Sequence, residues 1–272
     1  MCLTAGLFWA VLLAAPPFEA QCLLDAYPGV LCGFEGRESP VGSEVIACDG
    51  QRYPWDDGRQ KSLWERFQGP DLEDVFVFQY PAVEDWPPAP RDDPGLIRFE
   101  PLLERLYGAS ARDVAARLVR VKWFGRTVRI APNAAEPLRA VARELSKLPR
   151  RFRRYFTTTA GTFNWRPIHG TNLRSLHSYG VAIDVGIAYS DYWRWVRLKK
   201  GAPGPPPYRN RFPREVVEVF ERHGFLWGGR WSWFDTMHFE YRPELLCARR
   251  VAAPEPAPRS PGVSDREAPA PR

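Results

Sequence analysis

The chain has 272 residues, of which 44% are hydrophobic and 14% aromatic, so it is long enough to bury a substantial core as one domain with extensions. Its 11 Trp and 28 Pro residues favour a compact, loop-rich protein and argue against a helical bundle. The formal net charge of +6 suits an anionic partner.

The first twenty residues resemble an export signal. The apolar run from Ala5 to Ala15 is shorter than the roughly 20 residues that span a bilayer, and Ala20 offers a small residue for cleavage. No Lys or Arg precedes Leu7, and Phe18 stands where a small residue is preferred, so an uncleaved membrane anchor is the alternative. We expect residues 1–20 to be a signal peptide. The mature protein would then be exported to the periplasm, cell envelope or exterior, with no stable membrane span.

Cysteine usage agrees with export. Beyond Cys2, four cysteines remain, which allow three pairings and favour an oxidising compartment: Cys22, Cys32, Cys48 and Cys247. We favour Cys32 with Cys48 as a local loop, and Cys22 with Cys247 as a tie between the mature N-terminus and the end of the fold. Four reduced thiols are the alternative. No pair has the CxxC spacing of a zinc site.

The N-terminal part of the chain shows little periodicity. Residues 21–60 read as an irregular lead-in, and the prolines between Trp86 and Pro94 predict a surface loop. A helix is expected from Pro101 to the stop at Gly108. We assign residues 21–110 to a disulfide-pinned N-terminal extension.

Elements of both kinds follow. Helix starts are expected at Ser110 and Asn133, a β-hairpin over residues 119–130, and a helix over residues 213–223. Without a strand-helix-strand rhythm, this order predicts an α+β fold with a small antiparallel sheet flanked by helices. The domain with this α+β fold is expected to span residues 111–250. The Pro- and Ala-rich residues 251–272 lack aromatic side chains, which predicts a disordered tail.

Two histidines and a carboxylate form a candidate metal site. The β-rich run after Gly180 places Asp184 on a strand and His177 on the loop that enters it. In the segment 237–241, alternation puts His238 and Glu240 on one face. If these strands are neighbours, His177, Asp184 and His238 converge as the three protein ligands of a catalytic zinc ion, Zn2+, with the fourth position left to water.

Other polar residues could complete such a site. Asp235, three residues before His238, is the expected general base, and Glu240 is either a competing base or a residue that orients a ligand. Arg166 is expected to hold a substrate carbonyl or carboxylate, with Arg174 in reserve. The remaining histidines, His169 and His223, are assigned structural roles.

These motifs resemble those of a known family. The pattern Ser175-x-His177-x-x-Gly180-x-Ala182-x-Asp184, then Trp227-Gly228-Gly229-x-Trp231 and Asp235-x-x-His238, is similar to the zinc D-Ala-D-Ala carboxypeptidase family. That family includes the vancomycin-resistance D,D-peptidases and the L-alanyl-D-glutamate endolysin peptidases, and it shares its fold with the hedgehog signalling domain. The resemblance covers about residues 145–246. It implies that His177, Asp184 and His238 bind zinc and that Asp235 is the general base.

The function implied is hydrolysis of peptide bonds in peptidoglycan stem peptides, with zinc-bound water as nucleophile. An Asp at position 235 resembles the endolysin-type branch, but either a D-Ala-D-Ala carboxypeptidase or an L-Ala-D-Glu endopeptidase fits. The expected substrate groove is formed by Ser175, Tyr179, Trp227 and Trp231. The alternative is a non-catalytic cell-wall-binding or interaction module that keeps the fold. Nucleic-acid binding is disfavoured by the export signal and the predicted disulfides.

Overall fold

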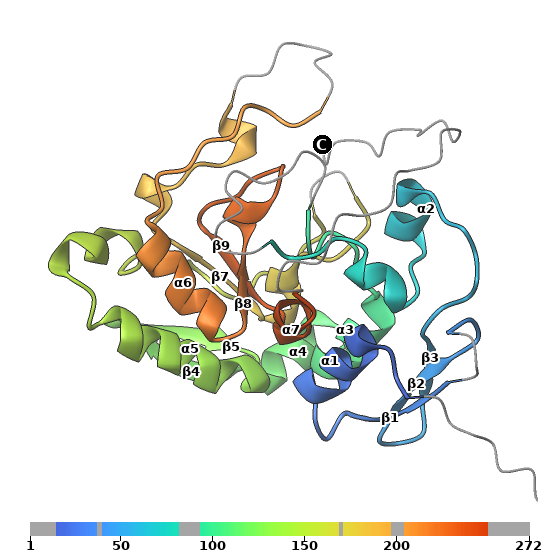
Figure 1. The fold of residues 1–272 in the computed structure, drawn as a ribbon. Helices are drawn as coiled ribbons and strands as arrows, with labels where there is room; N and C mark the ends of the chain where they lie inside the picture. Colours follow the sequence, from blue (N-terminus) through green and yellow to red (C-terminus); the bar gives the residue numbers. More distant parts are fainter. Residues whose placement is uncertain (1–14, 37–39, 82–92, 169–170, 197–203, 250–272) are drawn as a thin grey trace, which may run out of the picture.

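The structure, a computed structural model, describes residues 15–36, 40–81, 93–168, 171–196 and 204–249. Within these residues, three antiparallel sheets are combined with surrounding helices (Figure 1), which confirms the predicted α+β class. The predicted tail and most of the predicted loop Trp86–Pro94 lie outside the described residues.

The helices and strands are short. The α-helices are α1 (Phe18–Ala26), α2 (Leu63–Gln68), α3 (Glu100–Tyr107), α4 (Ala111–Arg117), α5 (Pro132–Leu145), α6 (Arg214–Arg222) and α7 (Pro243–Cys247). The strands are β1 (Leu31–Glu35), β2 (Glu44–Ala47), β3 (Arg52–Pro54), β4 (Val119–Trp123), β5 (Arg126–Ile130), β6 (Thr159–Gly161), β7 (Ala182–Val185), β8 (Phe225–Trp227) and β9 (His238–Tyr241).

The N-terminal extension is ordered, which corrects the expectation of an irregular lead-in over residues 21–60. Helix α1 is followed by a three-stranded sheet in the order β1-β2-β3. Apolar side chains from α1, the sheet and α3 form a core of their own, with Val45 and Leu23 almost fully buried. Strands of three to five residues leave too little sequence for alternation to be recognised.

Both predicted disulfides are confirmed. Cys32 in β1 pairs with Cys48, and Cys22 in α1 pairs with Cys247 at the end of α7. Helices α1 and α7 pack side by side, so the extension is fastened to the last helix of the domain. The predicted cleavage point after Ala20 lies within α1, where Ala20 is fully buried, and the signal peptide stays a prediction. In the described part of the chain, no helix combines the length and the apolar character needed to cross a bilayer.

The predicted elements between residues 101 and 145 are confirmed, with α5 beginning one residue before the expected Asn133. Helix α3 ends before Gly108, and α4 begins after Ser110, whose hydroxyl accepts a hydrogen bond from the backbone N–H of Asp113. Strands β4 and β5 form the expected hairpin. Helix α5 buries its apolar face on that hairpin and on α6.

A four-stranded antiparallel sheet in the order β6-β7-β9-β8 lies at the centre. Figure 1 shows α5 and α6 on one side of it and α1 and α3 on the other. The apolar residues Ile183, Val185 and Phe239 point into the core formed with α5 and α6. Because side chains alternate across a strand, the polar residues between them face the opposite side.

Candidate metal centre

Three elements bring the predicted ligands together. Asp184 lies on β7 and His238 opens β9, and the register of the two strands places these residues directly opposite each other. His177 lies on a short 3-10 helix, Leu176–Tyr179, which ends at Gly180 with φ +66°. This left-handed backbone conformation favours glycine in the tight turn after His177.

The donor atoms of His177, Asp184 and His238 all lie within 4.8 Å of one another. The Oδ1 atom of Asp184 is 3.1 Å from Nε2 of His177 and 3.0 Å from Nδ1 of His238. Two imidazole nitrogens and one carboxylate oxygen are thus directed at one point, as the sequence predicted. This is a donor set that zinc accepts.

The other nitrogen of each imidazole has its own partner. Nδ1 of His177 lies 3.3 Å from the carbonyl oxygen of Thr162, and Nε2 of His238 lies 3.1 Å from Oε2 of Glu240. Partners of this kind fix the tautomer and ring orientation of histidines that bind metals. The arrangement therefore fits a metal centre better than a pair of unconnected core histidines.

The charges in the cluster are strongly coupled. Although burial raises the pKa of Asp184, its contacts with the two histidines hold that pKa far below its usual range. Burial lowers the pKa of His238, but hydrogen bonds with Asp184 and Glu240 raise it to about 10. A metal ion bound here would take the place of a proton that bridges His238 and Asp184.

Asp235 lies next to this cluster. Its Oδ1 atom is buried and has no hydrogen-bond partner among the described residues, while its backbone N–H donates to the carbonyl of Gly228. Burial and the neighbouring charge of Asp184 raise the pKa of Asp235 to about 7. A carboxylate with these properties is suited to accept and return a proton near neutral pH.

Glu240 is fully buried and lies behind His238. Burial raises its pKa, but the hydrogen bond from His238 and the charge of Arg98 bring it below its ordinary value. This placement favours the predicted orienting role over that of a competing base, because the carboxylate faces the outer nitrogen of His238.

The two candidate cations differ in their surroundings. The side chain of Arg166 is exposed, and its charge acts on Asp235 and lowers the pKa of that carboxyl. Arg174, the reserve candidate, places its guanidinium over the ring of Trp165 at 4.7 Å from the centroid. Of the two candidates, Arg166 is therefore the one that combines an exposed side chain with an electrostatic effect on Asp235.

The predicted substrate groove needs correction. Tyr179 and Trp227 are fully buried in separate apolar cores, so neither side chain presents a surface to a substrate. Ser175 is also nearly buried. Trp231 is partly exposed, and its ring centroid lies 5.4 Å from that of His238. Of the four residues, Trp231 is the one placed to line the site.

Some site residues lacked any sequence signal. Tyr192 forms an isolated antiparallel bridge with Asp235, which puts both side chains on one face beside the cluster. Arg98 approaches Glu240 from the N-terminal extension. Of the two structural histidines, His223 ends α6 and lies 2.9 Å from a carboxylate oxygen of Glu144, as expected for a structural role, and His169 lies outside the described residues.

Comparison with known proteins bears on the same region. No curated protein and no solved structure was found to match the chain. A family model described as D-alanyl-D-alanine carboxypeptidase matches residues 169–241. This stretch contains the three candidate ligands together with Asp235, and the match supports a peptidase that acts on peptidoglycan. The resemblance seen in the sequence motifs is thereby confirmed for residues 169–241, which are similar to the D-alanyl-D-alanine carboxypeptidase family.

Proposed function

We propose that this chain is an exported zinc metallopeptidase that hydrolyses peptide bonds in the stem peptides of peptidoglycan. The observation that carries the proposal is the convergence of His177, Asp184 and His238 on one point, with the carboxylate of Asp235 beside them. The family match to residues 169–241 supplies the class of reaction.

His177 Nε2, Asp184 Oδ1 and His238 Nδ1 would hold the zinc ion. When bound, zinc polarises a carbonyl group and lowers the pKa of a water molecule to about 7. Asp235 accepts a proton from the attacking water and delivers it to the amine that leaves. Its raised pKa matches this exchange, because a general base works best when its pKa lies near the working pH.

Other side chains of the site bind and orient. Arg166 offers an exposed cation for a carboxylate or carbonyl of the substrate, and stem peptides carry free carboxylates. Trp231 provides an apolar wall next to His238. Glu240 holds the His238 ring from behind through Nε2.

Export is supported by the two disulfides, because such bonds persist in oxidising compartments outside the cytosol. The predicted signal peptide over residues 1–20 agrees with this location. The net charge of +6 would favour association with an anionic cell wall.

The decisive experiment is incubation of the purified, zinc-loaded protein with defined muropeptides and analysis of the products by mass spectrometry. Loss of a terminal D-Ala indicates a carboxypeptidase, and cleavage after L-Ala indicates an endopeptidase. Activity should disappear after chelation and return with zinc. If zinc-loaded protein binds the muropeptides and releases no product, the non-catalytic module is correct and the peptidase proposal is wrong.

A further inference from the structure

A buried arginine from the N-terminal extension reaches the back of the candidate metal centre. Nη2 of Arg98 lies 3.5 Å from Oε2 of Glu240. The same oxygen lies 3.1 Å from Nε2 of His238. The contacts therefore run in a chain from Arg98 through Glu240 to His238, and Arg98 stands far outside the family-matched residues 169–241.

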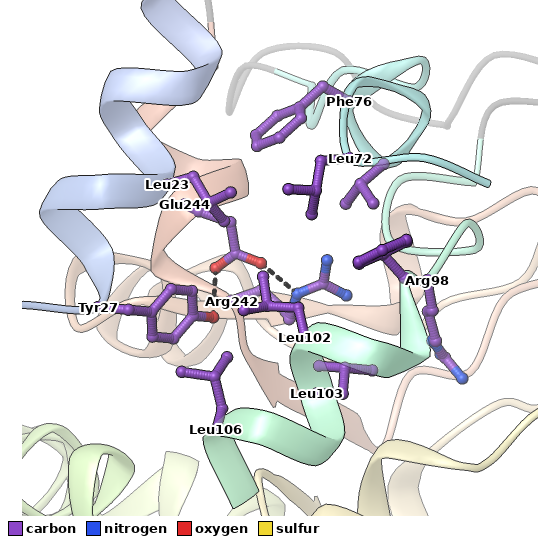
Figure 2. A pocket seen from close by; sticks show the side chains of 12 residues that line it. Leu23, Tyr27, Leu72, Phe76, Arg98, Leu102, Leu103, Leu106, Arg242 and Glu244 are labelled. Atoms are coloured by element: carbon purple, nitrogen blue, oxygen red, sulfur yellow. Dashed lines mark hydrogen bonds and ion pairs between the residues drawn. The ribbon is translucent and has the colours of Figure 1, made fainter. Parts of the chain in front are cut away.

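The guanidinium of Arg98 is fixed by its own hydrogen bonds. Nε donates to the carbonyl of Gly95 at 3.1 Å, and Nη1 donates to the carbonyl of Arg174 at 3.2 Å. Figure 2 shows the Arg98 side chain turned away from the cluster of Arg242, Glu244 and Tyr27. Because Nε and Nη1 are both hydrogen-bonded, the planar guanidinium is fixed in place. Its remaining nitrogen, Nη2, therefore faces Glu240 in a defined orientation.

Glu240 depends on this positive charge because its side chain has no access to water. Arg242 also lies close, with its Nη1 3.8 Å from Oε1 of Glu240. Arg242 also donates through Nε to Glu244, so its charge is shared between two carboxylates. Removal of one partner from a buried ion pair leaves a charge that must be neutralised or turned away. Loss of Arg98 would thus disturb Glu240, the carboxylate that contacts Nε2 of His238.

The segment that carries Arg98 also contacts Trp231, whose ring lies beside His238. Nε1 of Trp231 donates to the carbonyl of Pro94 at 2.7 Å. Gly95 has φ +86°, and a Cβ there would lie 2.7 Å from Oε1 of Glu240, so the backbone lies directly against that carboxylate. Residues 93–98 therefore contact both the support of His238 and the tryptophan beside its ring.

We propose that Arg98 is a positioning residue of the candidate metal centre: acting through Glu240, it sets the orientation of the His238 ring. By this route the N-terminal extension completes a site whose ligands all lie in the peptidase region. The inference relies on the proposed function for the identity of the metal, and on the contacts above for the role of Arg98.

Zinc affinity tests the proposal independently of hydrolysis. The dissociation constant is measured on the full chain by competition with a chromophoric chelator, and ligand geometry is followed by the visible spectrum of the Co2+-substituted protein. Arg98→Met should weaken zinc binding by about 10–100-fold and shift the cobalt spectrum. Arg98→Lys keeps the charge and should recover part of the affinity.

A matched control is Arg66→Met, which removes another arginine of the extension, one that pairs with buried Asp74 at 2.9 Å. Arg66→Met should lower stability and leave zinc affinity unchanged. A folded Arg98→Met protein with the zinc affinity and cobalt spectrum of the parent protein would overturn the proposal.

Two further variants keep the test decisive if Arg98→Met fails to fold. In a Glu240→Gln background, where the buried carboxylate that Arg98 pairs with is absent, adding Arg98→Met should change zinc affinity by less than about twofold; full additivity would contradict action through Glu240. Gly95→Ala should also weaken zinc binding. A parent protein that binds no zinc refutes both proposals, whereas one that binds zinc in this pattern and cleaves no muropeptide refutes the peptidase function alone.

Discussion

At the scale of single residues, each imidazole of the candidate centre has a partner on both ring nitrogens. One nitrogen points to Asp184 and the other to a fixed acceptor, Thr162 for His177 and Glu240 for His238. Neither ring can turn without losing both contacts. The site is therefore organised before any metal binds, which lowers the cost of binding.

Replacement of either histidine ligand should abolish zinc retention. We expect His177→Ala and His238→Ala to lose the metal on dialysis, because two protein ligands hold zinc far more weakly than three. Elemental analysis of the dialysed proteins provides the measurement. His223→Ala is the matched control, since His223 pairs with Glu144 at the end of α6, and it should keep full occupancy. Full occupancy in all three variants would disprove the ligand assignment.

Asp235 should be needed for turnover and dispensable for metal binding. Asp235→Ala removes the proposed proton acceptor, so the rate of muropeptide cleavage should fall by roughly a hundredfold or more while zinc remains bound. Steady-state kinetics and elemental analysis on the same preparation separate the two effects. Activity close to that of the parent protein would show that Asp235 is not the general base.

At the scale of elements, local sequence patterns correctly predicted the strands that carry the candidate site. The alternation in residues 237–241 placed His238 and Glu240 on one face, and the β-rich run put Asp184 on a strand that is indeed the neighbour of β9. The motif residues Trp227 and Tyr179 were expected to line a groove, yet both fill apolar cores. An aromatic residue in a motif does not reveal which side of the backbone faces the substrate.

Replacement of Gly186, which follows β7, should destabilise the fold. Gly186 has φ +60°, and a Cβ there would lie 2.3 Å from the carbonyl oxygen of Tyr155. We expect Gly186→Ala to lower the free energy of unfolding by about 1–3 kcal/mol more than Gly125→Ala. Gly125 has φ +85° with nothing within 4 Å of the added carbon, so it reports the backbone strain alone. Urea denaturation measures both, and equal losses would contradict the steric argument.

At the scale of the whole molecule, the sequence predicted the fold class, both disulfides and the spatial meeting of three candidate ligands. It did not predict the helix and sheet of the N-terminal extension, because strands β1 to β3 are too short to show the alternation of polar and apolar residues that marks a strand. Nor could it predict Arg98, since the contact with Glu240 arises only when the extension folds against the central sheet. A contact that depends only on tertiary packing cannot be predicted from local patterns in a single sequence.

The bond between Cys22 and Cys247 should stabilise the fold more than the local one. It closes a loop of 225 residues, against 16 for Cys32 and Cys48, and a longer loop restricts the unfolded chain more strongly. We expect the Cys22→Ser/Cys247→Ser protein to lose about 2–5 kcal/mol in free energy of unfolding, and the Cys32→Ser/Cys48→Ser protein to lose less. Denaturant titrations decide this, and the reverse order would argue against the loop-length model.

The same bond makes the polypeptide a covalent ring from α1 to α7. A protease that cuts the backbone once between these cysteines would open the ring without releasing a fragment. Nicked molecules would then migrate as one species in electrophoresis until a reductant separates the two fragments. Until that point, the candidate ligands on either side of the cut would remain covalently joined.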